Sequence, residues 1–403
     1  MSKNVPKLRF KGFEDEWKEK KLINFLSESR IPGSNGSKAK KLTVKLWAKG
    51  VVPKKEIYEG SDNTKYYTRK AGQLMYGKLD FLNCAFGIVP DHLDGYESTV
   101  DAPAFDIKNI NPYFLFSKII QKNFYKRNGD IADGSRKAKR IHSDVFLNMS
   151  IKVPSLEEQE KIANFLSKVD SIIEKQGKKI QYWNFYKKGM MQKIFKQEIR
   201  FKDDKGLDYP EWEEMTLGDV DVELTRGPFG SALKKEFMVD KGIETYKVYE
   251  QKHAIQKNIK IGEYYINKEK YNELKRFKVN PGDFIMSCSG TVGELFKIPN
   301  NAEKGVINQA LLKIEVGSKV NEEYFLYCFR KNLDGLETKG SGIKNITSVK
   351  FLKEEFIMPI PFLKEQEKIG DFFVKIDAIL DKEYKKLEEL KHLKKGLLQQ
   401  IFI

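Results

Sequence analysis

Histidine and cysteine side chains, which carry much of acid–base, nucleophilic and metal chemistry, are few and scattered in this 403-residue sequence. They are His92, His142, His253, His392, Cys84, Cys288 and Cys328. No histidine has a cysteine or carboxylate at the spacing of a metal site. No Gly-x-x-x-x-Gly-Lys-Ser/Thr loop is present to bind nucleotide phosphates. We therefore interpret these residues as structural, and we expect no catalytic residue, metal site or cofactor in this chain.

Basic side chains interleaved with aromatic and amide residues offer a different chemistry. Lysine and arginine contact phosphates, aromatic rings stack, and arginine and glutamine can pair with base edges in the major groove. Examples are KYYTRK (65–70), TRGPFGSALKK (225–235) and YEQKHAIQKN (249–258). The candidate nucleic-acid contacts are Lys65, Tyr67, Arg69, Lys70, Lys78, Arg136, Lys137, Lys139, Arg140, Arg226, Phe229, Ser231, Lys234, Gln251, Lys252, Ser289, Lys339 and Lys344.

The charge distribution also favours a polyanionic partner. The net charge is +16, and residues 1–197 hold 38 Lys+Arg against 22 Asp+Glu, whereas residues 198–403 hold 35 of each. The densest basic stretch is 122–140. An excess confined to one half is typical of an electrostatic footprint for nucleic acid, although an ordinary charged surface is the alternative.

Composition bounds the class of protein. Hydrophobic residues make up 40% of the chain, which is enough for folded cores, and the length predicts about two or three domains. No apolar run approaches the ~20 residues that a membrane span needs, and the segment MSKNVPKLRF has no apolar leader. Three cysteines cannot make a disulfide framework. We expect a cytoplasmic protein with no membrane partner.

The elements that position these residues come from a tandem repeat. Residues 156–195 and 363–402 align without a gap, with 19 of 40 positions identical. Each copy follows a variable block of about 130–150 residues, and the two blocks also begin alike. Arg9-Phe10-Lys11 and Trp17 resemble Arg200-Phe201-Lys202 and Trp212. Such a repeat predicts two similar halves, each made of one variable domain and one long tail.

Both tails have the apolar spacing of long helices that pair with each other. The apolar stripes step by 4, 3, 4 and 7 residues, which is heptad spacing. Ser155 and Glu158 form a capping-box pattern at the start of the first tail. The predicted helix-pairing residues are Ile162, Leu166, Val169, Ile173, Ile180, Ile369, Phe373, Ile376, Leu380 and Leu387.

The variable blocks have mixed α/β patterns. Residues 73–79, 283–289 and 310–316 are predicted strands. Residues 111–125 and 321–333 are predicted helices, and each begins at an asparagine cap. The predicted fold is α+β or mixed, with two tandem α/β domains joined by a long antiparallel two-helix coiled coil. The predicted divisions are 1–154 (first variable domain), 155–197 (central long helix), 198–360 (second variable domain) and 361–403 (C-terminal long helix).

These features together resemble the specificity subunit of type I restriction-modification enzymes. The resemblance rests on two variable blocks, each followed by an EQEKI helix that ends in KKGMMQKIF or KKGLLQQIF. PGDFIMSCSGTVG with the following INQALL, and PKLRF…EW near the start, are similar to the same family. The resemblance covers essentially the whole chain, and its most specific motifs lie in the helices.

The resemblance implies a non-catalytic subunit that reads double-stranded DNA. Each target-recognition domain would bind one half of a bipartite site, and the helices would set the gap and dock two methyltransferase subunits. Restriction and translocase subunits would complete the complex. S-adenosylmethionine, ATP and Mg²⁺ would belong to these partners. The absence of net charge in the second half departs from a uniformly basic DNA-binding protein. The alternative is a coiled-coil scaffold without sequence-specific DNA binding.

Overall fold

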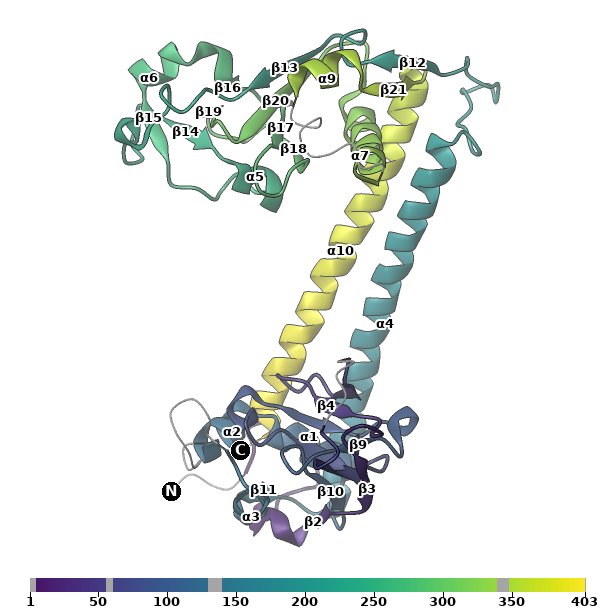
Figure 1. The fold of residues 1–403 in the computed structure, drawn as a ribbon, viewed down its shortest axis with the longest axis vertical. Coiled ribbons are helices and arrows are strands. Elements are labelled where there is room, and N and C mark those ends of the chain that lie inside the picture. Colours follow the sequence, from purple (N-terminus) through teal and green to yellow (C-terminus); the bar gives the residue numbers. More distant parts are fainter. Residues whose placement is uncertain (1–4, 56–60, 130–139, 339–347, 403) are drawn as a thin grey trace. The chain divides into compact units, whose positions relative to one another are not determined.

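The computed structural model describes residues 5–55, 61–129, 140–338 and 348–402. It divides into two compact units. The first unit is Met1–Lys178 with Lys385–Ile403, and the second unit is Lys179–Tyr384. Two long helices, α4 (Leu156–Phe195) and α10 (Leu363–Ile401), each contribute residues to both units (Figure 1). Both helices agree to within one residue with the repeated stretches 156–195 and 363–402.

The first unit is built around a small antiparallel sheet with the strand order β2-β10-β7-β8. Its strands are β2 (Leu26–Ser29), β10 (Ala104–Ile107), β7 (Leu74–Tyr76) and β8 (Phe86–Ile88). Around it lie the pair β1 (Lys18–Lys21) and β11 (Ser150–Val153), the hairpin β4 (Leu42–Val44) and β5 (Val51–Pro53), and the sheet β3 (Pro32–Asn35), β6 (Lys65–Thr68) and β9 (Glu97–Ser98). The short helices are α1 (Pro112–Ile119), α2 (Lys122–Gly129) and α3 (Ser143–Asn148).

The second unit repeats this plan with an antiparallel sheet in the corresponding order β13-β20-β17-β18. Its strands are β13 (Val222–Arg226), β20 (Leu311–Val316), β17 (Phe284–Ser287) and β18 (Leu295–Lys297). The pair β12 (Glu213–Thr216) and β21 (Ile357–Ile360) corresponds to β1 and β11. A second sheet contains β15 (Tyr265–Asn267), β14 (Thr245–Tyr249), β19 (Gly305–Ile307) and β16 (Lys278–Val279). The helices are α5 (Gln251–Gln256), α6 (Lys268–Glu273), α7 (Glu322–Thr338) and α9 (Val349–Glu354).

The end of each long helix completes the apolar core of a unit. In the first unit, the Phe402 ring lies 6.4 Å from Trp17 and 5.4 Å from Phe114 between ring centroids. In the second unit, Phe195 at the end of α4 lies 6.5 Å from Trp212. The N–H of Leu8 also donates to the carbonyl of Gln400, so segments near the two ends of the chain meet in the first unit.

The predicted helix-pairing residues divide between two roles. Ile162 and Leu166 are buried in the core of the first unit together with Trp17 and Phe114, so their main contacts are with the recognition domain. Val169, Ile180, Ile369, Phe373, Ile376 and Leu380 are also buried, while Ile173 and Leu387 are half-buried. The heptad pattern therefore predicts burial well but not which partner each side chain meets.

Ion pairs join the long helices inside each unit. In the second unit, Lys187 Nζ lies 2.5 Å from Asp377, and Lys179 lies 2.7 Å from Glu383. The residue with the higher number on α4 pairs with the residue with the lower number on α10, so the two helices are antiparallel in this unit. In the first unit, Lys394 lies 2.5 Å from Asp170. Lys394 and Asp170 are the repeat equivalents of Lys187 and Asp377, so the same pair occurs in both units.

The short elements agree with the predicted ones in type, with one correction. Strands β7, β17 and β20 lie inside the predicted ranges, and Asn111 and Asn321 accept from the N–H groups of Phe114 and Tyr324 as predicted. The single helix predicted over 111–125 is wrong because it breaks into α1 and α2. The Gln121 side chain donates to the Ser117 carbonyl at 2.6 Å, which terminates α1 without a glycine or proline.

Candidate nucleic-acid interface

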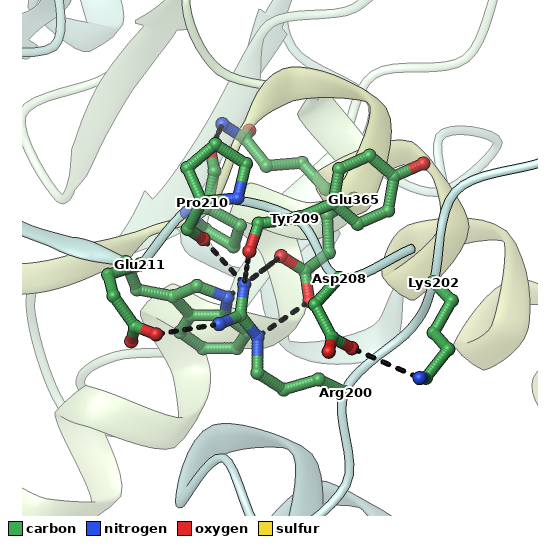
Figure 2. Close-up of polar contacts among 10 residues, drawn as sticks. Arg200, Lys202, Asp208, Tyr209, Pro210, Glu211 and Glu365 are labelled. Atoms are coloured by element: carbon green, nitrogen blue, oxygen red, sulfur yellow. Dashed lines mark hydrogen bonds and ion pairs between the residues drawn. The ribbon is translucent and has the colours of Figure 1, made fainter. Parts of the chain in front are cut away.

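A buried glutamate near the start of each long helix anchors the recognition domain beside it. In the second unit, Glu365 is fully buried and accepts from Arg200 at 2.8 Å and from the Trp212 indole N–H at 3.0 Å (Figure 2). The Arg200 guanidinium also donates to the carbonyls of Tyr209 and Pro210. Glu365 stabilises the charged guanidinium and raises the pKa of Arg200. A buried charge paired in this way fixes the start of α10 against the domain.

The first unit contains the same anchor. Glu158 is buried and accepts from Arg9 through two bonds of 2.8 Å, with the Trp17 indole N–H 3.4 Å away. This contact corrects the predicted capping box. Ser155 Oγ does accept from the Glu158 N–H at 3.4 Å, but the Glu158 carboxylate pairs with Arg9. The glutamate that the sequence assigns to a helix cap is therefore part of the domain anchor.

The next residue of each helix fixes a second element of its domain. Gln159 accepts from the Asn111 N–H at 3.0 Å, and Gln366 accepts from the Asn321 N–H at 2.8 Å. Both glutamines are buried. Asn111 caps α1, so the Glu-Gln pair holds both the N-terminal segment and the helix that follows the sheet. These anchors were not predicted from the sequence, although the repeated Glu-Gln, arginine and tryptophan positions carry the signal.

The candidate contacts of the first unit lie mainly on strand β6 and the turns that follow. Lys65 and Lys70 are exposed, whereas Tyr67 and Lys78 are half-buried. Arg140 is exposed and lies 3.9 Å from Asp101. Strand β6 pairs with β3 and β9, so this small sheet gathers Lys65, Tyr67 and Lys70 but not Arg140. Arg136, Lys137, Lys139, Lys339 and Lys344 lie outside the described residues.

Arg69 does not fit the role that the sequence suggests. Its side chain is buried, with Nε donating to Ser98 at 2.7 Å and Nη1 to the Ser29 carbonyl at 2.8 Å. Burial lowers the pKa of Arg69 to about 10. The guanidinium therefore links three strands of the domain, and we withdraw Arg69 as a direct DNA contact.

In the second unit, several candidates gather where strands β13 and β17 end. Arg226 is the last residue of β13. The next residue, Gly227, packs against the backbone of Asn308, and a Cβ added to Gly227 would lie 1.9 Å from the Asn308 carbonyl oxygen. Arg226 lies beside Cys288 and opposes the burial that raises the pKa of that thiol to about 11. Gln251, at the start of α5, approaches the exposed loop after β17 that contains Ser289. These residues form one surface region from three separate segments.

The side chains in this region differ in how far their polar atoms are paired. Arg226 Nη1 and Gln251 Oε1 are enclosed and have no hydrogen-bond partner in the part of the chain that the structure describes. Lys252 is paired with Glu250 at 2.7 Å, and Lys234 lies 3.5 Å from Glu236. Unpaired enclosed polar atoms are rare in folded proteins, so Arg226 and Gln251 keep hydrogen-bonding capacity that their surroundings in this region do not satisfy.

Phe229 and Ser231 extend the same region into solvent. The Phe229 side chain is 85% exposed, and Ser231 is also exposed. Single exposed apolar side chains are common on protein surfaces, so Phe229 is a candidate because of its position near Arg226 in the sequence and not because of its exposure.

The described residues contain no group of three or more His, Cys, Asp or Glu side chains that could hold a metal ion. Within the same ranges, no helix is long and apolar enough to cross a membrane.

Comparison with known sequences identifies the family. The family described as "Type I restriction modification DNA specificity domain" matches residues 102–182 and 209–392. These matches cover most of the chain and fall once in each variable block with its helix. The chain belongs to this family of DNA specificity subunits.

Two curated relatives come from Methanocaldococcus jannaschii. The MjaX specificity subunit of a type I restriction enzyme is 26% identical over 301 residues, which are 72% of this chain and 67% of the relative. The MjaVIII specificity subunit is 27% identical over 215 residues, which are 52% of this chain and 46% of the relative. The chain thus spans about two thirds of the first relative and about half of the second.

Solved structures share the fold. The S subunit of a type I restriction-modification system from M. genitalium has a TM-score of 0.54 at 15% identity, with 99% of each chain covered. A chain from a structural study of assembly and conformational transition of the type I R-M system has a TM-score of 0.57 at 16% identity, covering 98% of this chain and 99% of that one. At these identities the likeness is one of fold.

Proposed function

We propose that the chain is the non-catalytic subunit that reads double-stranded DNA for a type I restriction-modification complex. Each unit reads one half of a bipartite site. The observation that carries this proposal is the repeated frame of Arg9–Glu158 and Arg200–Glu365, which holds two domains with different exposed side chains. A repeated frame with different surfaces suits the recognition of two different half-sites.

In the second unit, base reading centres on Arg226 and Gln251. Arginine makes bidentate bonds with guanine, and glutamine does so with adenine, in the major groove. Nη1 of Arg226 and Oε1 of Gln251 lack partners among the described residues, so pairing with bases would satisfy groups that are otherwise unmet. In the first unit, Lys65 and Lys70 supply phosphate contacts and Tyr67 a stacking surface, all from β6 or its end.

The paired helices α4 and α10 set the gap between the half-sites in this proposal. Inserting four residues after Gln181 adds ~6 Å of helix and a net rotation of ~40°, so the apolar stripe stays nearly in phase. We expect unchanged half-sites with one or two more unspecified bases between them. A two-residue insertion rotates the stripe by ~200° and should impair folding instead. An identical gap in a well-folded four-residue variant would exclude a measuring role.

The remaining subunits supply the chemistry. Two methyltransferase subunits would dock on the helical frame, and restriction and translocase subunits would join them. S-adenosylmethionine provides the methyl group, while ATP and Mg²⁺ serve the motor and nuclease, and we assign all three to these partners. The cytoplasm, where cellular DNA is accessible, is the expected location.

The test is co-expression with a methyltransferase subunit of the same system, followed by genome-wide mapping of methyladenine. A single bipartite motif is the expected result. A matched control replaces Arg226 and Gln251 with alanine, which should relax one half of the motif and leave the other unchanged. Assembly without any motif would favour the coiled-coil scaffold.

A further inference from the structure

A cavity of about 1250 Å³ in the first unit is lined by residues from segments far apart in the sequence, and its charged lining residues are almost all basic. It lies among the end of α1, helix α2, strand β11 and the last turns of α10. The basic residues that line it are Lys118, Lys122, Lys126, Arg127, Lys152 and Lys395. Among the residues that the structure describes, Glu19 is the one acidic residue in the lining. Such an excess of cations around a concave surface attracts anions.

The cations at the rim of the cavity are available to a ligand. Lys122, Lys126, Arg127 and Lys395 are exposed, and none forms an ion pair with a carboxylate in the described ranges. Aromatic rings of Phe124, Tyr125 and Phe402 also line the cavity. The exposed cations are therefore not neutralised by a carboxylate that the structure describes.

Lys118 and Lys152 place further charge in the interior of the cavity. Lys118 is 8% exposed, and burial together with the nearby Lys152 lowers its pKa to about 8. A bound anion would offset both the desolvation of Lys118 and its repulsion with Lys152. The charges that face this group are Lys152 on β11, Glu19 on β1, Lys395 on α10 and the cations of α2.

The second unit shows that the fold does not require these charges. With the caps Asn111 and Asn321 aligned, Lys118 corresponds to Cys328 and Lys122 to Asn332. Cys328 is fully buried, so a small apolar side chain packs well at that position. In β21, Pro359 stands where β11 has Lys152. Lys118, Lys122 and Lys152 are thus special to the first unit, whereas Lys395 on the long helix has a lysine, Lys188, at its repeat-equivalent position.

We propose that this cavity binds the phosphate backbone of the DNA duplex outside the bases that the first unit reads. The inference rests on the proposed function and adds a second contact to it. Successive phosphates of one strand are about 3.4 Å apart along the duplex axis, so a cavity this large can meet several of them. The excess charge of residues 1–197 is the electrostatic counterpart of this contact.

The test uses the complex with its methyltransferase subunit and a triple variant, Lys122→Gln, Lys126→Gln and Lys395→Gln. These exposed residues are chosen so that the buried core is untouched. Lys11→Gln, Lys18→Gln and Lys108→Gln, which are also exposed and lie in the first unit outside the cavity lining and off the long helices, form a control of equal charge. Binding to a duplex with the mapped motif, and to one with a scrambled first half-site, is measured over a range of salt concentrations.

We expect the triple variant to lower affinity for both duplexes by the same factor. The slope of log K against log salt should flatten by ~2–3, at ~0.9 for each phosphate that the variant no longer neutralises, while the control changes neither quantity. Trimming the duplex beyond the first half-site should lower the affinity of the wild-type complex to a similar extent. A slope equal to that of the control would overturn the inference.

Two further outcomes separate this inference from others. The triple variant and the wild type are also compared in their affinity for poly-glutamate. If the triple variant binds poly-glutamate more weakly than the wild type does, while trimming the duplex affects both equally, the occupant is an acidic protein segment and the DNA proposal is wrong. If the wild-type complex itself fails to prefer the mapped duplex, the proposed function fails. A normal preference with an unchanged slope overturns the cavity proposal alone.

Discussion

The two units have the same frame but different surfaces and charges. Glu158 and Glu365 make the same contacts, and the central sheets have corresponding strand orders. The second sheets differ, because the first unit has three strands and the second has four, with β14 and β19 parallel. At one equivalent buried position, the first unit has Lys118 and the second unit has Cys328. The shared contacts attach each domain to its long helix in the same way, while the exposed and buried side chains of the two domains differ.

The largest expected effect comes from breaking the anchors. Glu158→Ala and Glu365→Ala each leave a partly buried arginine without its carboxylate, which should lower the free energy of unfolding by about 4 kcal/mol. We expect the larger loss in the first unit, because Arg9 would then keep the Asp15 carbonyl as its one hydrogen-bond partner among the described residues. Arg200 keeps two carbonyls and Glu211.

Urea denaturation, with hydrogen exchange to localise the loss, measures this difference. Glu160→Gln and Glu367→Gln are matched controls, since both side chains are exposed and occupy equivalent positions on the two helices. Equal losses in the two units would contradict the role of the extra Arg200 contacts.

A somewhat smaller effect is expected from the aromatic residues that end the helices. Phe402→Ala should cost about 3 kcal/mol because the ring is 7% exposed and packs on Trp17 and Phe114. Phe195→Ala should cost less, since Phe195 is only half-buried. Thermal unfolding of the two variants gives the comparison, and a larger loss for Phe195→Ala would show that the equivalence of the two ends is misjudged.

The smallest effect, with the opposite sign, concerns Lys118. Its pKa is lowered from 10.5 to about 8, so between these values the unfolded chain binds more protons and stability rises with pH. Below pH 8 the buried Lys118 side chain is charged, so the full cost of its burial lowers the free energy of unfolding. Lys118→Met should therefore stabilise the DNA-free protein at pH 7 by on the order of 2 kcal/mol and flatten the rise above pH 8. Lys122→Met is the exposed control. Denaturation at several pH values that shows destabilisation at pH 7 would contradict this account.

The sequence predicts the repeated parts of this molecule far better than the variable parts. Heptad spacing is a local signal, so it predicts that the tails are helical, and the limits of the repeat then lie within one residue of the bounds of α4 and α10. The Asn111 and Asn321 caps are also local signals. The break between α1 and α2 is set by the Gln121 side chain and by packing of Phe124 against Phe81, which no nearby breaker residue announces.

The candidate interface was predictable only in part, because burial depends on distant residues. Arg69 lies in a basic, aromatic segment like its exposed neighbours, but its partners Ser29 and Ser98 come from strands far along the chain. The basic cavity could not be predicted for a similar reason. Lys118, Lys152 and Lys395 belong to three segments that only the fold brings together.

The most direct test of the central claim, that each unit reads its own half-site, is a domain exchange. Residues 20–150 are replaced by the corresponding block of another family member, and methyladenine is mapped in cells that carry the matching methyltransferase subunit. The anchors Arg9, Trp17 and Glu158 lie outside the exchanged block, so the frame is retained. The account predicts that one half of the methylated motif changes and the other half stays the same. A simultaneous change in both halves, or no change in either, would contradict it.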